Sequence, residues 1–259
     1  MNTAGTVVRE ALYVRPRCLI QVQTHYCAGC GHGTVHRLLA EVIDELDIRS
    51  RAIGIAPVGC AVVAYDYIDI DWSESAHGRA PAVATGLKRV QPDRIVFTYQ
   101  GDGDLAAIGM AETIHAANRG ENITIIFINN AVYGMTQGQM APTTLVNQKT
   151  KTSPRGRNPQ TDGCPIRVCE LLSQFERVRF LARSTVTSPQ RVRETKRLIK
   201  RAFQYQITGV GFSLVEVLSP CPTYWRKTPV ECCEFIETTM VQTFPLGIIK
   251  EPAAEGKGA

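Results

Sequence analysis

The chain has 259 residues, of which 44% are hydrophobic and 20% are charged, and its formal net charge is +5. This length and composition are enough to bury the core of one large α/β domain. The lysines and arginines are spread along the sequence rather than gathered in blocks, which favours a mildly basic surface over nucleic-acid binding. No apolar run approaches the ~20 residues that cross a bilayer, so no membrane span is expected.

The N-terminal sequence has no basic start followed by an apolar stretch, so we expect no secretory signal and a cytoplasmic protein. Nine cysteines in such a protein indicate metal binding or redox work rather than a disulfide framework.

The first half of the chain alternates short apolar runs with helical patterns. Residues 65–72 alternate acidic and apolar side chains and fit either a short strand or an exposed loop. Strands are expected at residues 18–22, 51–57, 94–100 and 121–128, and helices at residues 34–46, 79–91 and 105–120.

The second half begins with a long segment, residues 133–165, that is rich in Gly, Thr, Gln and Pro. A structureless loop of this length inside a compact domain is usually functional or mobile. Further helices are expected at residues 166–174, 189–205 and 228–242, strands at 178–182 and 212–217, and a disordered tail at 251–259. Alternating strands and helices predict an α/β fold with a mostly parallel sheet and helices on both faces, formed by residues 1–250 as a single domain.

The most informative stretch lies in the middle of the chain, where Gly101-Asp102-Gly103 ends one apolar strand and Asn129-Asn130 ends the next. Parallel strands end at the same edge of a sheet, so Asp102 and Asn130 are expected to converge. Their oxygens suit Mg²⁺, and this edge is where α/β sheets bind phosphorylated ligands. Alone, the first tripeptide fits a plain strand-to-helix turn equally well. The asparagine pair favours a site for a magnesium-bound diphosphate.

Four cysteines are expected at that same edge. Cys27 and Cys30 form a Cys-x-x-Cys turn, and Cys60 and Cys221 follow separate predicted strands. A zinc ribbon would need a second close pair of cysteines, which the sequence lacks. Four converging thiolates satisfy a [4Fe–4S] cluster. Spacing alone leaves a cluster, a zinc ion and unliganded thiols as open alternatives.

The histidines divide into two groups by position. His36 and His115 fall inside predicted helices, where a structural role is the simpler interpretation. His32 and His77 lie in glycine-containing turns at element boundaries, where a role in a site is equally plausible.

The long loop carries four basic residues, Lys149, Lys151, Arg155 and Arg157. The simplest interpretation is a solvated basic surface. The alternative is a surface that grips an anionic substrate such as coenzyme A.

Several motifs together carry a family likeness. Gly101-Asp102-Gly103 and Asn129-Asn130, with 25 residues between them, resemble the thiamine-diphosphate fingerprint. With CAGCGHG, APVGC, AHGRAPAVATGLK, YGMTQGQ and VEVLSPCPT, the chain resembles the β subunit of 2-oxoacid:ferredoxin oxidoreductases over roughly residues 25–225. The family usually has proline where this chain has Ala28, a difference expected to alter the stiffness of the turn but not ligation.

The resemblance implies three cofactors, namely thiamine diphosphate, Mg²⁺ and one [4Fe–4S] cluster. Asp102 and Asn130 would bind Mg²⁺ through their side chains and Val132 through its carbonyl. Cys27, Cys30, Cys60 and Cys221 would hold the cluster. The diphosphate would contact Gly103, Asp104, Gly134 and Met135, and the rest of the cofactor would lie near Val58, Gly59, Ala61 and His77, with His77 as the candidate catalytic residue.

The resemblance also implies an activity: oxidative decarboxylation of a 2-oxoacid, with coenzyme A capturing the acyl group and electrons passing through the cluster to ferredoxin. The sequences around Cys60 and after Cys221 favour 2-oxoglutarate or a branched-chain acid, with pyruvate as an alternative. Two further alternatives are a non-redox thiamine-dependent decarboxylase subunit and an iron–sulfur scaffold without catalysis.

The resemblance implies partner chains as well. Thiamine enzymes use a carboxylate against the aminopyrimidine ring, and in this type it comes from a pyrimidine-binding domain. We expect an α subunit to supply that domain, and γ and ferredoxin-like δ subunits are further candidate partners.

Overall fold

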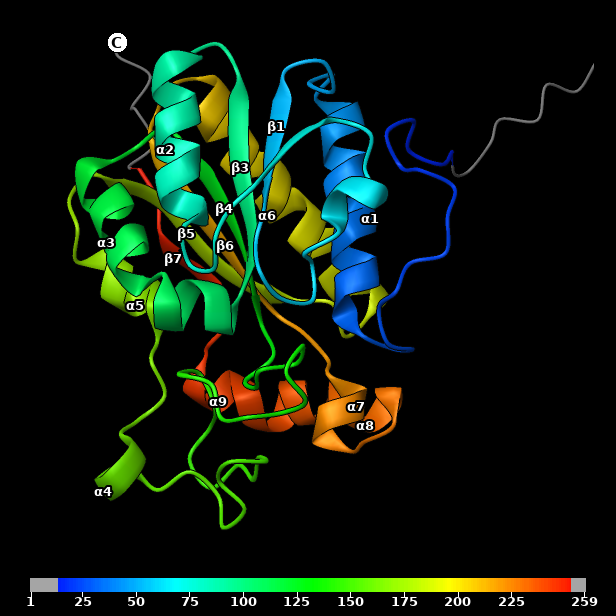
Figure 1. Cartoon of the computed structure of the whole chain (residues 1–259), viewed down its shortest axis with the longest axis vertical. Coiled ribbons are helices and arrows are strands. Elements are labelled where there is room, and N and C mark those ends of the chain that lie inside the picture. Colours follow the sequence, from blue (N-terminus) through cyan, green and yellow to red (C-terminus); the bar gives the residue numbers. More distant parts are fainter. Residues whose placement is uncertain (1–13, 253–259) are drawn as a thin grey trace, which may run out of the picture.

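A computed structural model describes residues 14–252, and its centre is one seven-stranded sheet (Figure 1). The strand order is β2-β1-β3-β4-β6-β5-β7, and every pair is parallel except β5 with β7. The predicted α/β class with a mostly parallel sheet is therefore confirmed. The strands are β1 (Ala52–Ala56), β2 (Asp71–Glu74), β3 (Ile95–Gly101), β4 (Thr124–Asn129), β5 (Val178–Thr185), β6 (Phe212–Leu218) and β7 (Gly247–Lys250).

Helices cover both faces of the sheet (Figure 1). Helices α1 (Gly31–Glu45) and α6 (Pro189–Ile207) pack together on one face, and their apolar residues join one hydrophobic cluster. Helices α2 (Ala80–Val90), α3 (Met110–Arg119) and α5 (Val168–Ser173) bury a second cluster on the other face. Within residues 14–252, no helix is both long enough and apolar enough to cross a membrane.

The central strands explain where the site forms. All residues of β4 are buried, and in β3 all but the last are, as expected for parallel strands covered on both faces. Gly101 pairs with Ile128, so the two strands end side by side at one edge. The residues that follow them, Asp102 and Asn130, are therefore brought together as predicted.

The predicted strand at residues 18–22 is wrong. Only Leu19 forms a bridge, with Ile68. The partner segment is bent by a 3₁₀ turn, η1 (Ala64–Asp66), so it offers no extended neighbour beyond one pair. Residues 65–72, for which strand and loop were both open, include the last two residues of this turn and the first two residues of β2.

The helix predicted at residues 105–120 is interrupted. It begins as a π-helical turn, η2 (Asp104–Ile108), and breaks at Gly109 before α3. A Cβ atom on Gly109 would lie 2.5 Å from the carbonyl oxygens of both Asp104 and Gly78. The wide turn is compatible with this close approach of two backbone segments, and π-turns occur often at functional sites.

The C-terminal region forms a layer beneath the edge that carries Asp102 (Figure 1). The helix predicted at residues 228–242 is continuous but changes its pitch in the middle. Strand β7 was not predicted, and the disordered tail expected from residue 251 lies outside the described residues from position 253 onward. The remaining elements are α4 (Pro159–Asp162), α7 (Pro222–Trp225), α8 (Pro229–Phe235), η3 (Ile236–Met240) and α9 (Val241–Thr243).

A buried ion network ties β5 to β6 and α5. Arg183 has no exposed side-chain surface and binds Glu216 Oε2 at 2.8 Å and Glu170 Oε2 at 2.6 Å. Burial raises the pKa of Glu170, but the guanidinium groups of Arg183 and Arg167 outweigh it and bring the pKa to about 2. Glu216 in turn accepts a hydrogen bond from Asn129 at 2.8 Å, beside the metal-site candidate Asn130.

We expect Arg183→Met to lower the free energy of unfolding by about 3–5 kcal/mol, because Glu216 would stay buried without a counter-ion. Urea unfolding followed by circular dichroism measures the change. Arg179→Met, at an exposed position of the same strand, is the matched control and should change stability little. A loss for Arg183→Met no larger than that of the control would contradict the network's role.

Candidate active site

Asp102 is the centre of the polar site at the end of β3. Its side chain is buried, with 4% of the residue exposed. Oδ2 accepts hydrogen bonds from Thr143 Oγ1 at 3.0 Å and from the backbone N–H of Val132 at 3.2 Å. Burial raises the pKa of Asp102 to about 7, and the groups that lower it are neutral donors with no cation among them. This carboxylate therefore lacks the positive partner that buried charges need.

The Asn130 side chain completes a cluster of oxygens. One of the two heavy atoms of the Asn130 side-chain amide group lies 2.6 Å from the carbonyl oxygen of Val132 and 3.2 Å from Asp102 Oδ2. With nitrogen at that position the amide donates to both oxygens. With oxygen there, the Val132 N–H donates to it at 3.3 Å as well as to Asp102 Oδ2, but no proton lies between this oxygen and the Val132 carbonyl oxygen. Because the orientation of an amide is assigned from its surroundings, a hard cation bound at this point would select the second arrangement. The donor set fits Mg²⁺.

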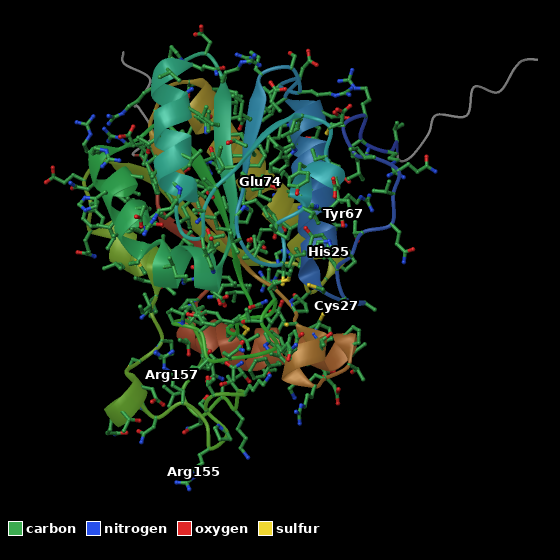
Figure 2. All side chains as sticks on the ribbon, in the orientation of Figure 1. His25, Cys27, Tyr67, Glu74, Arg155 and Arg157 are labelled. Atoms are coloured by element: carbon green, nitrogen blue, oxygen red, sulfur yellow. The ribbon has the colours of Figure 1, made fainter. Side chains whose placement is uncertain are left out.

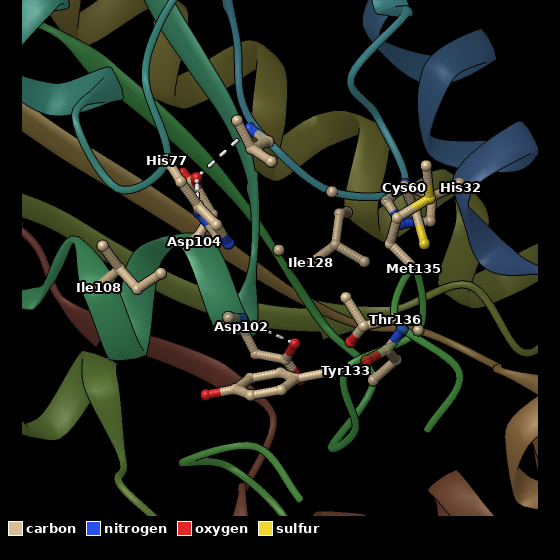
Figure 3. Close-up of a pocket in the computed structure, with 16 residues that line it drawn as sticks. His32, Cys60, His77, Asp102, Asp104, Ile108, Ile128, Tyr133, Met135 and Thr136 are labelled. Atoms are coloured by element: carbon tan, nitrogen blue, oxygen red, sulfur yellow. Dashed lines mark hydrogen bonds and ion pairs between the residues drawn. The ribbon is translucent and has the colours of Figure 1, made fainter. Parts of the chain in front are cut away.

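Asp104 organises the opposite wall of the site (Figure 3). Its buried carboxylate accepts hydrogen bonds from His77 Nδ1 at 2.7 Å, from the Gly78 N–H at 2.8 Å and from Gln100 Nε2 at 2.6 Å. A longer bond of 3.4 Å reaches the N–H of Val58. One carboxylate thus joins the ends of three segments that follow β1, β2 and β3. The His77 ring is half-exposed, and its other nitrogen, Nε2, takes no part in the hydrogen bond to Asp104.

The four predicted cluster cysteines line one cavity of about 140 Å³. Cys30 caps the N-terminus of α1, and its N–H closes the Cys-x-x-Cys turn onto the Cys27 carbonyl at 3.0 Å. Cys60 follows β1 and Cys221 follows β6. Cys27 is exposed at the lower end of α1 (Figure 2). Four cysteines from three distant parts of the chain therefore meet at the same edge of the sheet.

The thiols lie close enough to influence one another. Burial, followed by the nearby Cys30, Asp102 and Cys27, raises the pKa of Cys60 to about 12. Burial also raises the pKa of Cys221, and Cys30 and Cys60 add to the effect. Within residues 14–252, no three His, Cys, Asp or Glu side chains meet closely enough to hold a single metal ion. Four thiols that line one cavity are a donor set that fits a [4Fe–4S] cluster.

A second cavity, of about 290 Å³, is lined by Asp102, Asp104 and His77 (Figure 3). It adjoins the cysteine cavity. Cys60, Asn130, Gly134 and Met135 line both. A Cβ atom on Gly134 would lie 3.1 Å from Cys60 Sγ and 3.5 Å from Asn130 Nδ2. Gly134 therefore lies between the two cavities, in close contact with Cys60 and Asn130.

Comparisons with known proteins agree with this arrangement. Residues 57–217 match the family described as thiamine pyrophosphate enzyme, C-terminal TPP binding domain. The 2-oxoglutarate synthase subunit KorB of Methanocaldococcus jannaschii is 34% identical, over 90% of this chain and 84% of that protein. The chain belongs to the family of 2-oxoacid:ferredoxin oxidoreductase β subunits.

A second member of the family is more similar in sequence. The ketoisovalerate oxidoreductase subunit VorA of Methanothermobacter thermautotrophicus is 52% identical over 232 residues, which are 90% of this chain but 49% of that protein. The chain thus spans about half the length of that relative. A solved 2-oxoglutarate:ferredoxin oxidoreductase from Magnetococcus marinus shares the fold, with a TM-score of 0.77 and 24% identity over 93% of this chain and 86% of that one.

All but one of the residues predicted to contact the cofactor line the larger of the two cavities. Ala61 is buried, with 2% exposed, and does not line the cavity. Val132 contributes through its backbone beside Asn130. The residues that line the cavity are Val58, Gly59, His77, Gly103, Asp104, Gly134 and Met135.

Sequence reasoning missed three residues that shape this site. Thr143 binds Asp102, Gln100 binds Asp104, and His25 Nε2 donates to the Cys60 carbonyl oxygen at 2.7 Å. Gln100 offered a signal, since a polar residue ends an otherwise apolar strand next to Gly101. Thr143 offered none, because it lies 41 positions from Asp102 in an irregular loop.

The histidines differ in burial and in what they contact. His36 is buried against Tyr26, whose hydroxyl lies 3.1 Å from Nε2, and His115 is exposed on α3. His32 lines the larger cavity, with Nδ1 2.9 Å from the Tyr99 hydroxyl. Burial lowers the pKa of His32 to about 3, so this ring is neutral at physiological pH.

The interpretation of the basic loop as a solvated surface is wrong for Arg157. Lys149, Lys151 and Arg155 are exposed, but Arg157 is buried, with 4% exposed. Figure 2 shows Arg155 at the outer end of the loop and Arg157 nearer the sheet. Arg157 is buried because backbone carbonyls surround its guanidinium group, which no local pattern of charge indicates.

We expect Asp104→Asn to lower the free energy of unfolding by about 1–3 kcal/mol, because an amide N–H₂ would face donors in a buried site. It should also release His77 from the cavity wall. Urea unfolding measures the first effect, and the chemical shift of the His77 ring measures the second. Asp93→Asn, at an exposed position, is the control. Equal stability of the two variants would show that the Asp104 hydrogen bonds do not organise this wall.

Proposed function

We propose that this chain is the thiamine-diphosphate-binding and iron–sulfur-binding β subunit of a 2-oxoacid:ferredoxin oxidoreductase. The observation that carries the proposal is the shared wall at Gly134, which separates a cavity with a magnesium donor set from a cavity ringed by four cysteines. A carbon centre oxidised in the first cavity would lie next to an electron acceptor in the second. A simple thiamine-dependent decarboxylase has no use for the second cavity.

The magnesium site would use Asp102 and Asn130 side-chain oxygens with the Val132 carbonyl. The convergence of these three oxygens supports it. The diphosphate would lie beside Gly103, Gly134 and Met135. Bound thiamine diphosphate would supply the carbanion chemistry and the cluster one-electron transfer. The protein holds these groups next to each other and limits access of water.

His77 is the best candidate for a proton-handling residue at the larger cavity. Asp104 accepts from Nδ1, which fixes the ring orientation and leaves Nε2 for a ligand. Val58 and Gly59 lie beside it on the loop that leads to Cys60. We infer that this wall contacts the thiazolium side of the cofactor and the reacting acid, while Ala61 packs behind it.

A branched-chain 2-oxoacid is the favoured substrate. The relative named for ketoisovalerate is more similar to this chain than the relative named for 2-oxoglutarate. Among the described residues, the larger cavity is lined by Val58, Ile108, Ile128 and Met135 and by no lysine or arginine that would pair with a second carboxylate. 2-Oxoglutarate and pyruvate are the alternatives. Coenzyme A would accept the acyl group and ferredoxin the electrons.

The active centre needs a second chain. No glutamate of the described residues lines the larger cavity, so the carboxylate that serves the aminopyrimidine ring would come from an α subunit. Gamma and ferredoxin-like delta subunits are candidates for the remaining functions.

We expect the anaerobically purified chain to contain four iron and four sulfide per chain and to give the EPR signal of a reduced [4Fe–4S] cluster after dithionite treatment. Cys60→Ser should lower the iron content, because it removes one thiolate ligand. Cys164→Ser, at an exposed cysteine away from the cavity, is the matched control. Fewer than four irons in the wild-type chain would favour a non-redox thiamine-dependent subunit.

We expect the purified chain alone to show no coenzyme A-dependent viologen reduction with any 2-oxoacid, because half of the cofactor site is missing. Adding the co-purified α subunit should restore turnover, fastest with 2-oxoisovalerate in a panel that includes 2-oxoglutarate and pyruvate. Turnover by the chain alone would refute the shared active centre. A preference for 2-oxoglutarate would overturn only the substrate assignment.

A further inference from the structure

The turn formed by Pro142, Thr143 and Thr144 contacts both halves of the candidate magnesium site. The Thr143 hydroxyl donates to Asp102 Oδ2 at 3.0 Å, after β3. The Thr144 hydroxyl donates to the Ala131 carbonyl at 2.7 Å, after β4. Two adjacent hydroxyls in one turn therefore hold the carboxylate ligand and the backbone between the other two ligands, Asn130 and Val132.

That backbone needs support because it is strained. Ala131 has φ 55°, a left-handed conformation that costs energy for a residue with a Cβ atom. The Ala131 N–H donates to Asn129 Oδ1 at 3.1 Å, and its carbonyl accepts from Gln148 at 3.3 Å as well as from Thr144. The conformation aims Asn130 and the Val132 carbonyl at the same point. It persists because donors and acceptors on both sides hold it.

Arg157 holds the turn in place. Every side-chain hydrogen bond that it makes within the described chain goes to a backbone carbonyl. Nη1 bonds the carbonyls on both sides of Thr143, at 2.8 Å to Pro142 and 2.8 Å to Thr144. The complete set of acceptors is Ala141, Pro142, Thr144, Asp162, Gly163 and Cys164. The planar guanidinium fork of arginine can serve such a set, whereas the ammonium of lysine cannot.

We propose that Arg157 is a positioning residue for the magnesium site and acts through the Pro142–Thr144 turn. This inference rests on the proposed function, since the site it orders is the one assigned to Mg²⁺ and thiamine diphosphate. Arg157 touches neither group. It immobilises the carbonyls that flank Thr143, so that the two threonine hydroxyls stay aimed at Asp102 and Ala131. The loop that carries Arg157 is therefore coupled to metal affinity.

The test uses the full-length chain in its complex, with Mn²⁺ as the probe for the metal site in the presence of thiamine diphosphate. EPR of free and bound Mn²⁺ measures the dissociation constant without reference to turnover. We expect Arg157→Lys, which keeps the charge and loses the fork, to weaken Mn²⁺ binding about 10- to 100-fold, the range for residues that orient metal ligands. Thr143→Val should weaken it similarly, and Thr143→Ser should restore wild-type binding.

Arg155→Lys is the matched control, because Arg155 lies two positions away and is exposed. In the Arg157→Lys, Thr143→Val double variant, the increase in the Mn²⁺ dissociation constant should be smaller than the product of the two single increases. The reason is that both changes act on the hydrogen bond from Thr143 to Asp102. If Arg157→Lys does not fold, Arg157→Gln, which keeps two donor N–H groups, is measured in its place. Thr143→Val and Thr144→Val then test the turn through which Arg157 acts, and both should weaken binding.

Three results would overturn the inference. One is a lower melting temperature for Arg157→Lys with an unchanged Mn²⁺ dissociation constant, which indicates a structural role only. Another is a double variant whose effect equals the product of the single ones. The third is wild-type affinity in both threonine variants. Failure of the wild-type complex to bind Mn²⁺ with thiamine diphosphate would refute the proposed function as well, which separates the two conclusions.

Discussion

Parallel pairing of β1, β3, β4 and β6 is the constraint on which the rest of the molecule depends. It brings the carboxyl ends of four strands to one edge, and each of these ends leads to a ligand candidate: Cys60, Asp102, Asn130 and Cys221. The register pairs residues directly across neighbouring strands, so no long loop is needed to bring the ligands together. The Cys-x-x-Cys turn joins them because α1 begins at that edge. The strand ends at this edge therefore supply most of the residues that a diphosphate site beside an electron acceptor would need.

Two arginines support the strained backbone at the centre of this edge from opposite directions. Arg183 lies inside the sheet and orders Asn129 through Glu216, and Asn129 accepts the N–H of Ala131. Arg157 lies in the loop and orders Thr144, which binds the carbonyl of the same residue. The candidate metal ligands on either side of Ala131 are thus held by the core and by the loop at once. A left-handed alanine persists only where surrounding contacts on several sides hold its backbone in this way.

Under the proposed function, the two cavities would form one half of an active centre. This chain provides oxygen ligands, thiols and a histidine, but the described lining of the larger cavity contains no glutamate. Under the proposed function, a site divided between chains would keep a reactive cofactor inactive until the partner is present. The apolar lining from Ile108 and Ile128 offers a surface against which a branched side chain can pack.

The sequence by itself determined the fold class, the convergence of Asp102 with Asn130 and the meeting of four cysteines, because continuous apolar runs specify buried parallel strands and their ends share one edge. Only the folded structure shows that residues 18–22 form no strand, that η2 is a π-turn, that β7 pairs with β5 at the edge of the sheet and that Arg157 is buried. It also revealed Thr143 as a partner of Asp102. These features depend on backbone groups supplied by distant segments. A basic, polar loop has the same residue pattern whether its arginine meets water or six carbonyl oxygens, and only the folded chain distinguishes the two.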